Sequence, residues 1–444
     1  MATELEWDEL HQRLVTTEIV WLKKLSRNDC SWADAPKDLH QAGFYVPRDA
    51  RAGDFFPQLT NRNPSKPHIF EAEIQTEWLG SDEQRLSRLV HYSNKGHETH
   101  VTRVPREEFS GLTPASLLIC GRVGMYEGTA AYWFAIVDSA SEAASILESV
   151  FDLGVGFHNG FFKPEEYLRA ARDATDILIE ELRLALAEGT LDRYVAGAAT
   201  LPSSDRLASL AQAEYLNERK ISALNPFTLA CPGDAVMEIS RDVEYRLYKA
   251  AEIRHRAGDV LRILTSGAHP DLASAVVRGY PELTATFLSA SQHRKSRAGR
   301  SFENHIARLL EDGGVAFKAQ AVTGGRRPDF VMPEASALRG PAAASAIVLS
   351  AKTTLRERWK QIALERFDAS LFLATVDDRI SSDAINDMAT QQICLVVPES
   401  LKKAKETDYG GKANVITFKE FFEVEVLAKR KDQLLGRPKV SSLF

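Results

Sequence analysis

The chain has 444 residues, of which 44% are apolar and 26% charged, a composition typical of globular proteins with room for about three domains. No run of ~18 uncharged apolar residues occurs, and the acidic N-terminal segment lacks the basic start of a signal peptide. The cysteines, Cys30, Cys120, Cys231 and Cys394, are too widely separated to indicate a disulfide framework or a thiolate zinc site. We therefore expect a cytoplasmic protein with reduced thiols and no membrane partner.

Positive charge is concentrated in two stretches of an otherwise acidic chain. The net charge is −6, yet residues 291–330 contain eight basic and four acidic residues, and residues 352–366 contain five basic and two acidic ones. Such local charge is typical of a surface that binds a polyanion, although a solvated helix face gives the same pattern.

The first 150 residues contain short β-branched or aromatic segments separated by Gly, Pro, Asn or Asp, which predicts a sandwich or barrel. The expected strands cover residues 42–47, 68–78, 87–93, 116–123 and 130–136. Basic residues of the polar stretches around them are either merely solvated or candidates for contact with nucleic acid. These candidates include Lys23, Arg27, Lys95 and Arg103.

The hydrophobic period changes after Lys163. An i, i+3, i+4 pattern from Tyr167 to Leu186 predicts an amphipathic helix that ends near Gly189. The Ala- and Ser-rich stretch over residues 196–209 is expected to be a linker. Further helices are expected over residues 236–264, 271–288 and 301–311, the second of them starting at Asp271.

The last third of the chain alternates between strand and helix patterns, which predicts an α/β domain. The expected strands cover residues 315–320, 328–332, 346–354, 370–376 and 393–398, and the helices residues 357–367 and 382–390. We therefore expect a β-rich domain over residues 1–155, a helical segment and linker over 156–233, and the α/β domain over 234–444.

Three residues of this alternation carry a recognisable chemistry. Asp329 follows Pro328 at a strand, Lys352 lies near the end of the next long strand, and Glu365 lies on the helix after it. One or two carboxylates suffice to hold Mg²⁺, which polarises a phosphodiester and supplies hydroxide, and a lysine can stabilise the developing charge. This is the logic of the Pro-Asp…(Asp/Glu)-x-Lys nuclease core. The sequence predicts that Asp329 and Glu365 bind Mg²⁺ and that Lys352 serves hydrolysis.

One position departs from that core. Ser350 stands two residues before Lys352, where the core has its second carboxylate. Glu365 offers a substitute, because the helix after the strand can bring a carboxylate back over the strand end, and Arg358 and Glu365, seven residues apart, point to the same side. Two alternatives stay open: a DNA-binding regulator with an inactive nuclease centre, and a repair nuclease with the same core.

The triplet Arg356-Glu357-Arg358 lies just after Lys352. In the major groove an arginine pairs with guanine O6 and N7, and a glutamate accepts from cytosine N4. The triplet is therefore suited to reading neighbouring G·C pairs, although an exposed first helical turn with charge pairs is the alternative.

These residues resemble the EcoRII-type (type IIE) restriction endonucleases of the PD-(D/E)XK nuclease superfamily. The resemblance runs through residues 294–303, 328–330, 352–362 and 395–398. It implies that Glu303 is a further acidic residue of the site and that Arg356, Glu357 and Arg358 contact a CC/GG-containing site in double-stranded DNA. It also implies that Arg294 and Lys295 contact DNA, Lys295 near the backbone of the cut strand.

Residues 23–29 and 40–47 are similar to the effector domain of that family, a DNA-binding fold related to plant B3 domains. This similarity implies DNA contacts by Lys23, Arg27 and His40, and a domain that binds a second recognition site and restrains the nuclease. The expected fold class is therefore an α/β restriction-endonuclease-like domain, with a mixed sheet flanked by helices, plus an N-terminal mainly-β B3-like pseudobarrel.

Two partners besides DNA are expected. A homodimer is expected, because two symmetry-related active sites most simply cut a symmetric duplex. A cognate DNA methyltransferase is expected in the same system.

The run His97-Glu98-Thr99-His100 does not indicate a zinc protease. Its histidines are spaced i, i+3 rather than i, i+4, and we expect them in a polar loop that contacts DNA or is merely solvated. No P-loop occurs in the sequence, so nucleotide-driven translocation is not indicated.

Overall fold

The computed structural model describes residues 7–34, 42–94, 98–139, 141–153, 157–197, 201–266, 271–321, 327–355, 359 and 369–435. The chain divides into two compact units. The first consists of residues 1–172 with two short later segments, 378–382 and 404–410, and the second of residues 173–377, 383–403 and 411–444. Within the described residues, no helix combines the length and the apolar character needed to cross a bilayer.

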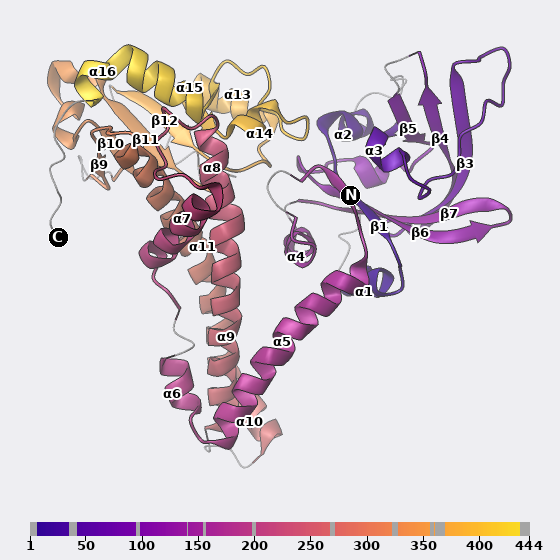
Figure 1. Ribbon diagram of the computed structural model, residues 1–444, viewed down its shortest axis with the longest axis horizontal. Coiled ribbons are helices and arrows are strands. Elements are labelled where there is room, and N and C mark those ends of the chain that lie inside the picture. Colours follow the sequence, from indigo (N-terminus) through magenta and orange to yellow (C-terminus); the bar gives the residue numbers. More distant parts are fainter. Residues whose placement is uncertain are drawn as a thin grey trace. The chain divides into compact units, whose positions relative to one another are not determined.

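The first unit is built on an eight-stranded sheet with the order β2-β5-β4-β3-β7-β6-β1-β8 (Figure 1). Its strands are β1 (Val20–Lys24), β2 (Gly43–Tyr45), β3 (Ile69–Trp78), β4 (Glu83–Tyr92), β5 (Glu98–Thr102), β6 (Leu117–Tyr126), β7 (Thr129–Val137) and β8 (Asn159–Phe162). The strands β3 and β7 pair in parallel, and the other neighbours pair antiparallel. The helices of this unit are α1 (Trp7–Val15), α2 (Arg27–Asp34), α3 (Arg48–Arg51) and α4 (Glu142–Val150).

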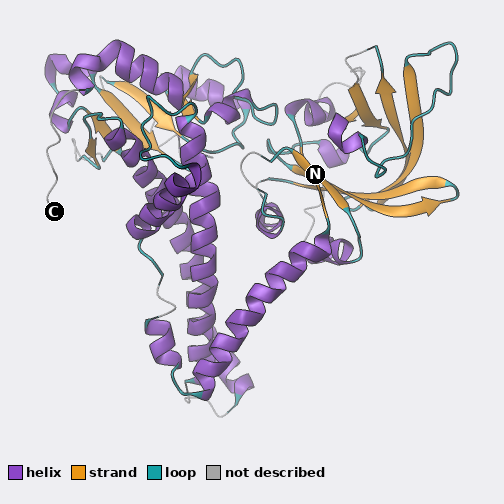
Figure 2. Ribbon diagram, viewed as in Figure 1, coloured by secondary structure: helices purple, strands orange, loops and turns teal. Residues whose placement is uncertain are grey.

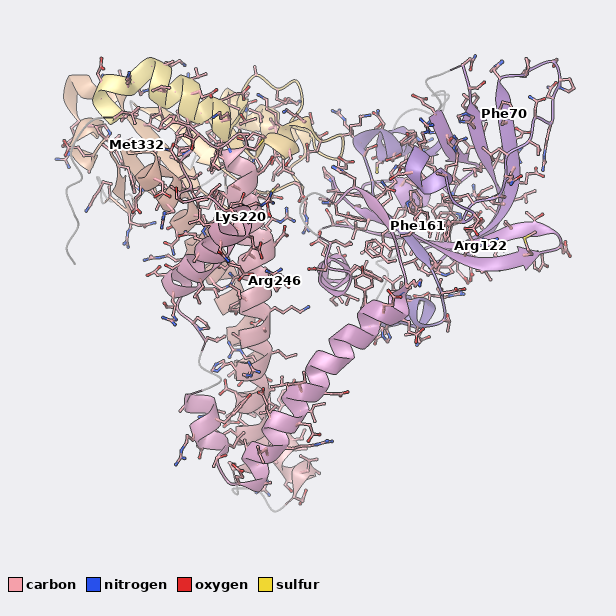
Figure 3. All side chains as sticks on the ribbon, viewed as in Figure 1. Phe70, Arg122, Phe161, Lys220, Arg246 and Met332 are labelled. Carbon is pink, nitrogen blue, oxygen red and sulfur yellow. The ribbon has the colours of Figure 1, made fainter. Side chains whose placement is uncertain are left out.

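Both faces of this sheet carry a buried apolar cluster, because successive residues of a strand point to opposite faces. In β7, Phe134 belongs to one cluster, whereas its neighbours Trp133 and Ala135 belong to the other. Phe161 of β8 contacts Phe55, with ring centroids 5.1 Å apart (Figure 3). The aromatic and β-branched residues that predict the strands are thus the residues that fill the core.

Gly43 begins β2 and has to be glycine. Its φ is +144°, and a Cβ atom there would lie 2.0 Å from the carbonyl oxygen of Val101 on the neighbouring strand β5. The predicted strand over residues 42–47 is therefore a real one, trimmed to three residues that pair with β5.

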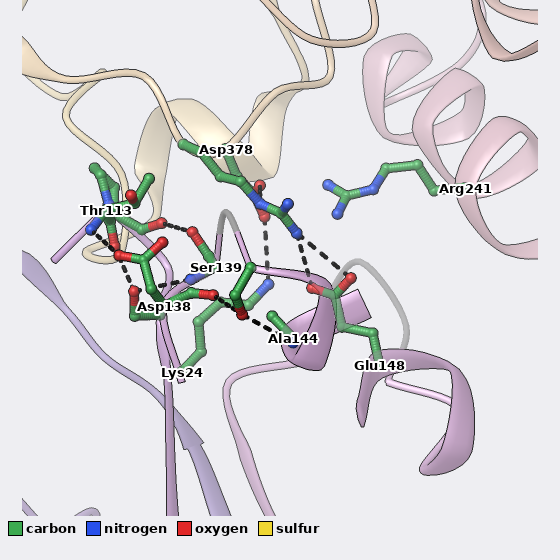
Figure 4. Close-up of polar contacts among 12 residues, drawn as sticks. Lys24, Thr113, Asp138, Ser139, Ala144, Glu148, Arg241 and Asp378 are labelled. Atoms are coloured by element: carbon green, nitrogen blue, oxygen red, sulfur yellow. Dashed lines mark hydrogen bonds and ion pairs between the residues drawn. The ribbon is translucent and has the colours of Figure 1, made fainter. Parts of the chain in front are cut away.

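The later segment 378–382 makes ion pairs within the first unit (Figure 4). Nζ of Lys24 lies 3.4 Å from Oδ2 of Asp378, and the guanidinium of Arg379 lies 3.2 Å from Oε1 of Glu148. These contacts explain why residues 378–382 belong to this unit although they lie far along the sequence.

The second unit begins with helices, followed by a mixed sheet. The helices are α5 (Pro164–Ala187, whose first residues belong to the first unit), α6 (Leu191–Ala196), α7 (Ser204–Arg219), α8 (Pro232–Glu238), α9 (Glu244–Thr265), α10 (Leu272–Arg278) and α11 (Tyr280–Asp312). A π-helical turn over Ile239–Val243 joins α8 to α9, and the long helices α9 and α11 lie side by side (Figure 2). Arg246 of α9 pairs with Glu214 of α7 at 2.5 Å (Figure 3).

The sheet of the second unit has six strands in the order β14-β13-β12-β11-β10-β9. They are β9 (Lys318–Ala319), β10 (Phe330–Met332), β11 (Ile347–Ala351), β12 (Ser370–Ala374), β13 (Cys394–Val397) and β14 (Val415–Thr417). The strands from β11 to β14 run parallel, and β9, β10 and β11 pair antiparallel. Helices α13 (Ser382–Thr390), α14 (Glu399–Lys403), α15 (Phe418–Glu420) and α16 (Lys429–Leu434) and a π-helix (Phe421–Ala428) accompany them.

The predicted fold class is confirmed: a mainly-β N-terminal part and a mixed sheet flanked by helices in the C-terminal part. Each predicted strand overlaps an observed one. Four observed strands, β1, β5, β8 and β14, have no counterpart in the prediction. The prediction of a polar loop over Glu98–His100 is wrong, because these residues pair with β4 as part of β5.

The predicted helix boundaries also need correction. The prediction of a linker over residues 196–209 is wrong from residue 204 onward, where α7 begins. Ser203 caps this helix by accepting a hydrogen bond from the backbone N–H of Arg206. The separate helices predicted at 271–288 and 301–311 are instead α10 and one continuous helix, α11. Asp271 does cap α10, as predicted, by accepting from the backbone N–H of Ser274 at 2.8 Å.

Candidate active site

Asp329 lies immediately before β10, on the side of the sheet where β11 ends. Because β10 pairs antiparallel with β11, with Phe330 opposite Leu349, the Asp329 carboxylate lies beside the last residue of β11 and Lys352. Its Oδ2 accepts a hydrogen bond from the backbone N–H of Ala351 at 2.8 Å and from Nζ of Lys352 at 2.8 Å. The aspartate is 7% exposed, whereas the lysine side chain is 29% exposed. A buried carboxylate is thus paired with an ammonium that solvent, and therefore a substrate, can reach.

Glu303, on helix α11, adds a second carboxylate to the group. Nε2 of Gln320 donates to Oε2 of Glu303 at 2.7 Å and to Oδ1 of Asp329 at 3.3 Å. One amide nitrogen therefore bridges the two carboxylates. Glu303, Asp329 and Lys352, which the sequence or the resemblance predicts as site residues, lie together.

The electrostatics of this group follow from its burial. Burial raises the pKa of the Glu303 carboxyl above its ordinary value, and the negative charge of Asp329 raises it further. Lys352 and the hydrogen bond from Gln320 act in the opposite direction. Two partly buried carboxylates next to each other repel, and a divalent cation between them would relieve that repulsion.

The donor set fits a hard divalent cation. Glu303 and Asp329 supply carboxylate oxygens, the ligands that Mg²⁺ prefers, and the nearby cationic group, Lys352, bonds the other oxygen of Asp329. Glu303 also supplies the second carboxylate that the nuclease core has at the position of Ser350. Ser350 is 4% exposed and lies in β11 opposite Leu373. The second carboxylate of this site comes from helix α11 rather than from the strand.

Several predicted residues lie outside the described part of the chain. Glu365, Arg356, Glu357 and Arg358 fall in the ranges 356–358 and 360–368, and His40 and Lys95 fall in 35–41 and 95–97. Arg294 and Lys295 lie within α11, eight or nine residues before Glu303. Their roles stay predictions.

Lys23 has a different environment from the one that its charge suggests. Its side chain is 6% exposed, and Nζ bonds Oδ2 of Asp29 at 2.6 Å and the carbonyl oxygen of Tyr45 at 2.7 Å. Asp29 also accepts from the backbone N–H groups of Ser26 and Tyr45. The buried Lys23–Asp29 pair therefore joins β1, the start of α2 and β2, which is a structural role.

Two other basic candidates of the first unit are exposed. The side chain of Arg27 is 60% exposed and lies 3.4 Å from Asp408, and that of Arg103 is 55% exposed and lies 3.4 Å from Glu73. Exposed ion pairs of this kind are weak, so both guanidinium groups are free to exchange a carboxylate for a phosphate.

A second group of potential ligand atoms does not suit a metal. Atoms of Cys231, Asp234 and Glu399 lie within 4.8 Å of one another. However, Oε2 of Glu399 accepts from the backbone N–H of Gly233 at 2.9 Å and of Asp234 at 3.0 Å, and Asp234 accepts from the N–H of Ser400 at 2.9 Å. Partial burial and the Asp234 charge raise the pKa of the Cys231 thiol, which disfavours the thiolate that a metal needs. The carboxylates cap helices α8 and α14.

The comparison with known families concerns the part of the chain that contains this site. A family model described as the EcoRII C-terminal domain matches residues 266–422, a range that includes Glu303, Gln320, Asp329 and Lys352. Residues 266–422 therefore resemble the EcoRII C-terminal domain. The resemblance to EcoRII-type restriction endonucleases that the sequence shows is thereby confirmed.

Two relatives extend this result. The chain is 26% identical over 396 residues to the type II restriction enzyme EcoRII of Escherichia coli, covering 86% of this chain and 88% of that protein. It is 30% identical over 156 residues to the type II restriction enzyme SsoII of Shigella sonnei, covering 32% of this chain and 50% of that protein. The chain is therefore similar to EcoRII over most of its length and to SsoII over half of the length of SsoII.

Solved structures also match parts of this chain. Metal-depleted Ecl18kI in complex with uncleaved, modified DNA matches with a TM-score of 0.46 and 20% identity, covering 56% of this chain and 87% of that one. The B3 domain of the UbaLAI restriction endonuclease with cognate DNA matches with a TM-score of 0.26 and 18% identity, covering 36% of this chain and 98% of that one.

Sequence reasoning missed Gln320. A glutamine between a short strand and a Gly- and Arg-rich stretch carries no motif, and its position between Glu303 and Asp329 depends on strand pairing that the sequence does not display. Its backbone conformation, with φ of +51°, has no sequence signal either, because glutamine rarely adopts it.

Proposed function

We propose that this chain is a sequence-specific type II restriction endonuclease that hydrolyses phosphodiester bonds of double-stranded DNA with Mg²⁺. The observation that carries the proposal is the group formed by Glu303, Asp329 and Lys352 within the EcoRII C-terminal family domain. Hydrolysis here means that a water oxygen bonds to phosphorus, a P–O bond to one sugar breaks, and that sugar oxygen leaves with a proton.

The residues divide this work. Glu303 and Asp329 would hold Mg²⁺, which when bound polarises the phosphate and lowers the pKa of water. Lys352 is fixed by Asp329 at 2.8 Å, so its ammonium is oriented before DNA arrives and can stabilise negative charge on the phosphate oxygens. Glu365 is proposed as a further metal ligand.

We further propose the specificity and the regulation that the resemblance implies. Arg356, Glu357 and Arg358 would read G·C pairs of a CC/GG-containing site, and Arg294 and Lys295 would contact the DNA backbone. The first unit would be a B3-like domain that binds a second copy of the site, through residues such as Arg27, His40, Lys95 and Arg103, and so releases the nuclease. A homodimer and a cognate methyltransferase complete this proposal.

The direct test is incubation of the purified chain with plasmid DNA and Mg²⁺. Discrete fragments, whose sequenced ends share one CC/GG-containing motif, would support the proposal, and cutting without any common motif would favour a repair nuclease. Ser350 in place of a strand carboxylate favours a second candidate, a DNA-binding regulator with an inactive centre. Specific binding without cutting at any Mg²⁺ concentration would support that candidate instead.

The regulatory part has its own test. The cleavage rate of a plasmid with one site is measured with and without a short duplex that carries the same site. A rate that rises with the specific duplex, and not with an unrelated duplex, supports control by a second site. Equal rates would contradict control by a second site and would leave the proposed nuclease activity unaffected.

A further inference from the structure

The side chain of Gln320 spans the two carboxylates of the candidate active site. We propose that Gln320 is a positioning residue of the metal site, which holds Glu303 against Asp329 so that both carboxylates can bind one divalent cation. The inference rests on the proposed function, because it assigns a role within that same site.

The backbone of Gln320 is anchored to the residue that its side chain serves. Its N–H donates to the carbonyl oxygen of Asp329 at 2.9 Å, directly beyond the pairing of Ala319 with Phe330. Its φ of +51° lies in the left-handed region, which residues with a side chain rarely adopt. Non-glycine residues held in this way are concentrated at functional sites, where the surrounding structure imposes them. Here the conformation directs the amide toward the two carboxylates.

The hydrogen bonds divide the carboxylate oxygens into two sets. Oδ2 of Asp329 is occupied by Ala351 and Lys352, whereas Oδ1 of Asp329 and Oε2 of Glu303 each accept from Nε2 of Gln320. On Asp329, the oxygen that the amide reaches is therefore the one that Ala351 and Lys352 leave for a cation. Each carboxylate oxygen has two lone pairs, so an oxygen can accept from the amide and still bind a metal.

The chemistry of an amide suits this task better than that of a charged group. Two neighbouring carboxylates repel, so Glu303 would turn away from Asp329 unless a donor held it. A lysine or arginine between them would hold them and also cancel the negative charge that attracts a metal. The neutral amide of Gln320 donates one N–H to each carboxylate and leaves their charge intact. Such supporting hydrogen bonds typically change metal affinity by about 10–100-fold.

The test compares Gln320→Ala and Gln320→Met with a matched control, Gln392→Ala. Gln392 is exposed and has a φ of +58°, so its replacement changes a left-handed glutamine between α13 and β13, on elements that carry none of the site residues. Mn²⁺ binding to the full chain is measured by calorimetry without DNA, together with the thermal midpoint and DNA binding in EDTA. We expect both Gln320 variants to bind Mn²⁺ about 10–100-fold more weakly, with the midpoint and the metal-free DNA affinity unchanged. The control should bind Mn²⁺ as the wild type does.

Cleavage assays complete the test. A positioning role predicts that saturating Mg²⁺ restores most of the cleavage rate of Gln320→Met, because the variant lacks metal affinity rather than a reacting group. If the wild type binds Mn²⁺ and cuts DNA, and both Gln320 variants bind Mn²⁺ with the same affinity, the role of Gln320 is overturned while the proposed function stands. A wild-type chain that neither binds Mn²⁺ nor cuts DNA would overturn the proposed function, and the role of Gln320 with it.

Discussion

Glu244, the first residue of α9, and His305 of α11 form a hydrogen-bonded pair with both side chains fully buried, at 3.0 Å from Oε2 to Nε2. Nδ1 of the histidine faces the amide of Gln212 at 3.0 Å, so the amide donates to Nδ1 and the ring proton lies on Nε2, facing Glu244. Arg297 and Ser301 of the same helix face also bond Glu244. Because Glu303 lies on α11 between Ser301 and His305, this buried cluster fixes the rotation of the helix that carries a site carboxylate.

Replacement of Glu244 by alanine is expected to lower the free energy of unfolding by about 3–5 kcal/mol, because a buried guanidinium loses its counter-ion. Urea unfolding of the full chain measures this change. The matched control is Glu282→Ala, which removes an exposed carboxylate from the first turn of α11 and should change the stability by less than about 0.5 kcal/mol. Equal effects of the two substitutions would contradict the role of the buried cluster.

The ionisation of Glu303 gives a prediction for the pH dependence of stability. Burial and Asp329 raise the pKa of Glu303, so the folded chain holds this proton more strongly than the unfolded chain does. The stability contributed by Glu303 therefore falls as the pH rises from the ordinary pKa of a glutamate, ~4.3, through the raised value. In EDTA, Glu303→Gln should be more stable than the wild type at about pH 8 and similar to it at about pH 4.

Urea midpoints at both pH values check this prediction. Glu311→Gln, an exposed position of α11, is the control and should show no such difference. If Glu303→Gln is no more stable than the wild type at the higher pH, burial of the ionised Glu303 carboxylate does not destabilise the fold.

Asp329→Ala and Lys352→Ala are expected to stop cleavage while specific DNA binding in EDTA is kept. The aspartate holds both the proposed metal and the lysine ammonium, and loss of a single group that stabilises developing charge typically costs about 10²–10³-fold in rate. Plasmid cleavage and gel shifts with a duplex carrying the site measure the two properties. Loss of binding together with loss of cutting in both variants would count against these roles.

The linear order of the sequence predicts much of this site, and its limits are physical. Asp329 and Lys352 are predictable because one lies at the start of a strand-like segment and the other near the end of the next, and antiparallel pairing of the two strands brings these ends together. Gln320 is not predictable, because its role depends on a left-handed φ and on the pairing of β9 with β10. Local charge also fails for Lys23, since the sequence does not show that Asp29 will bury it. The long helix α11 is divided in the prediction because its middle is rich in polar and basic residues, which leave no apolar stripe to follow.

Lys23 and Arg27 should respond differently to removal of their charge. Lys23→Met breaks a buried ion pair and is expected to lower the stability by about 3–5 kcal/mol. Arg27→Met removes the ion pair of an exposed guanidinium, worth less than about 1 kcal/mol, but it should lower the salt dependence of DNA binding by about one phosphate contact, a slope change of ~0.9. Urea unfolding and fluorescence anisotropy across salt concentrations measure the two effects. A reversal of this pattern, with Arg27 stabilising and Lys23 acting only on DNA affinity, would refute the assignment.

Arg358→Ala tests the proposed reading of the bases by the triplet after Lys352. An arginine that pairs with guanine O6 and N7 contributes about 1–3 kcal/mol of discrimination against a wrong base, so its loss should bring the cleavage rates of the true site and a single-base variant closer together. The rates are compared on duplexes that differ at one G·C pair. Lys318→Ala removes one positive charge from an exposed position of β9 and serves as the control, which should leave the preference unchanged. An Arg358→Ala enzyme with the preference of the wild type would assign this arginine to a solvated helix face, because a guanidinium that contacts no base contributes no discrimination between bases.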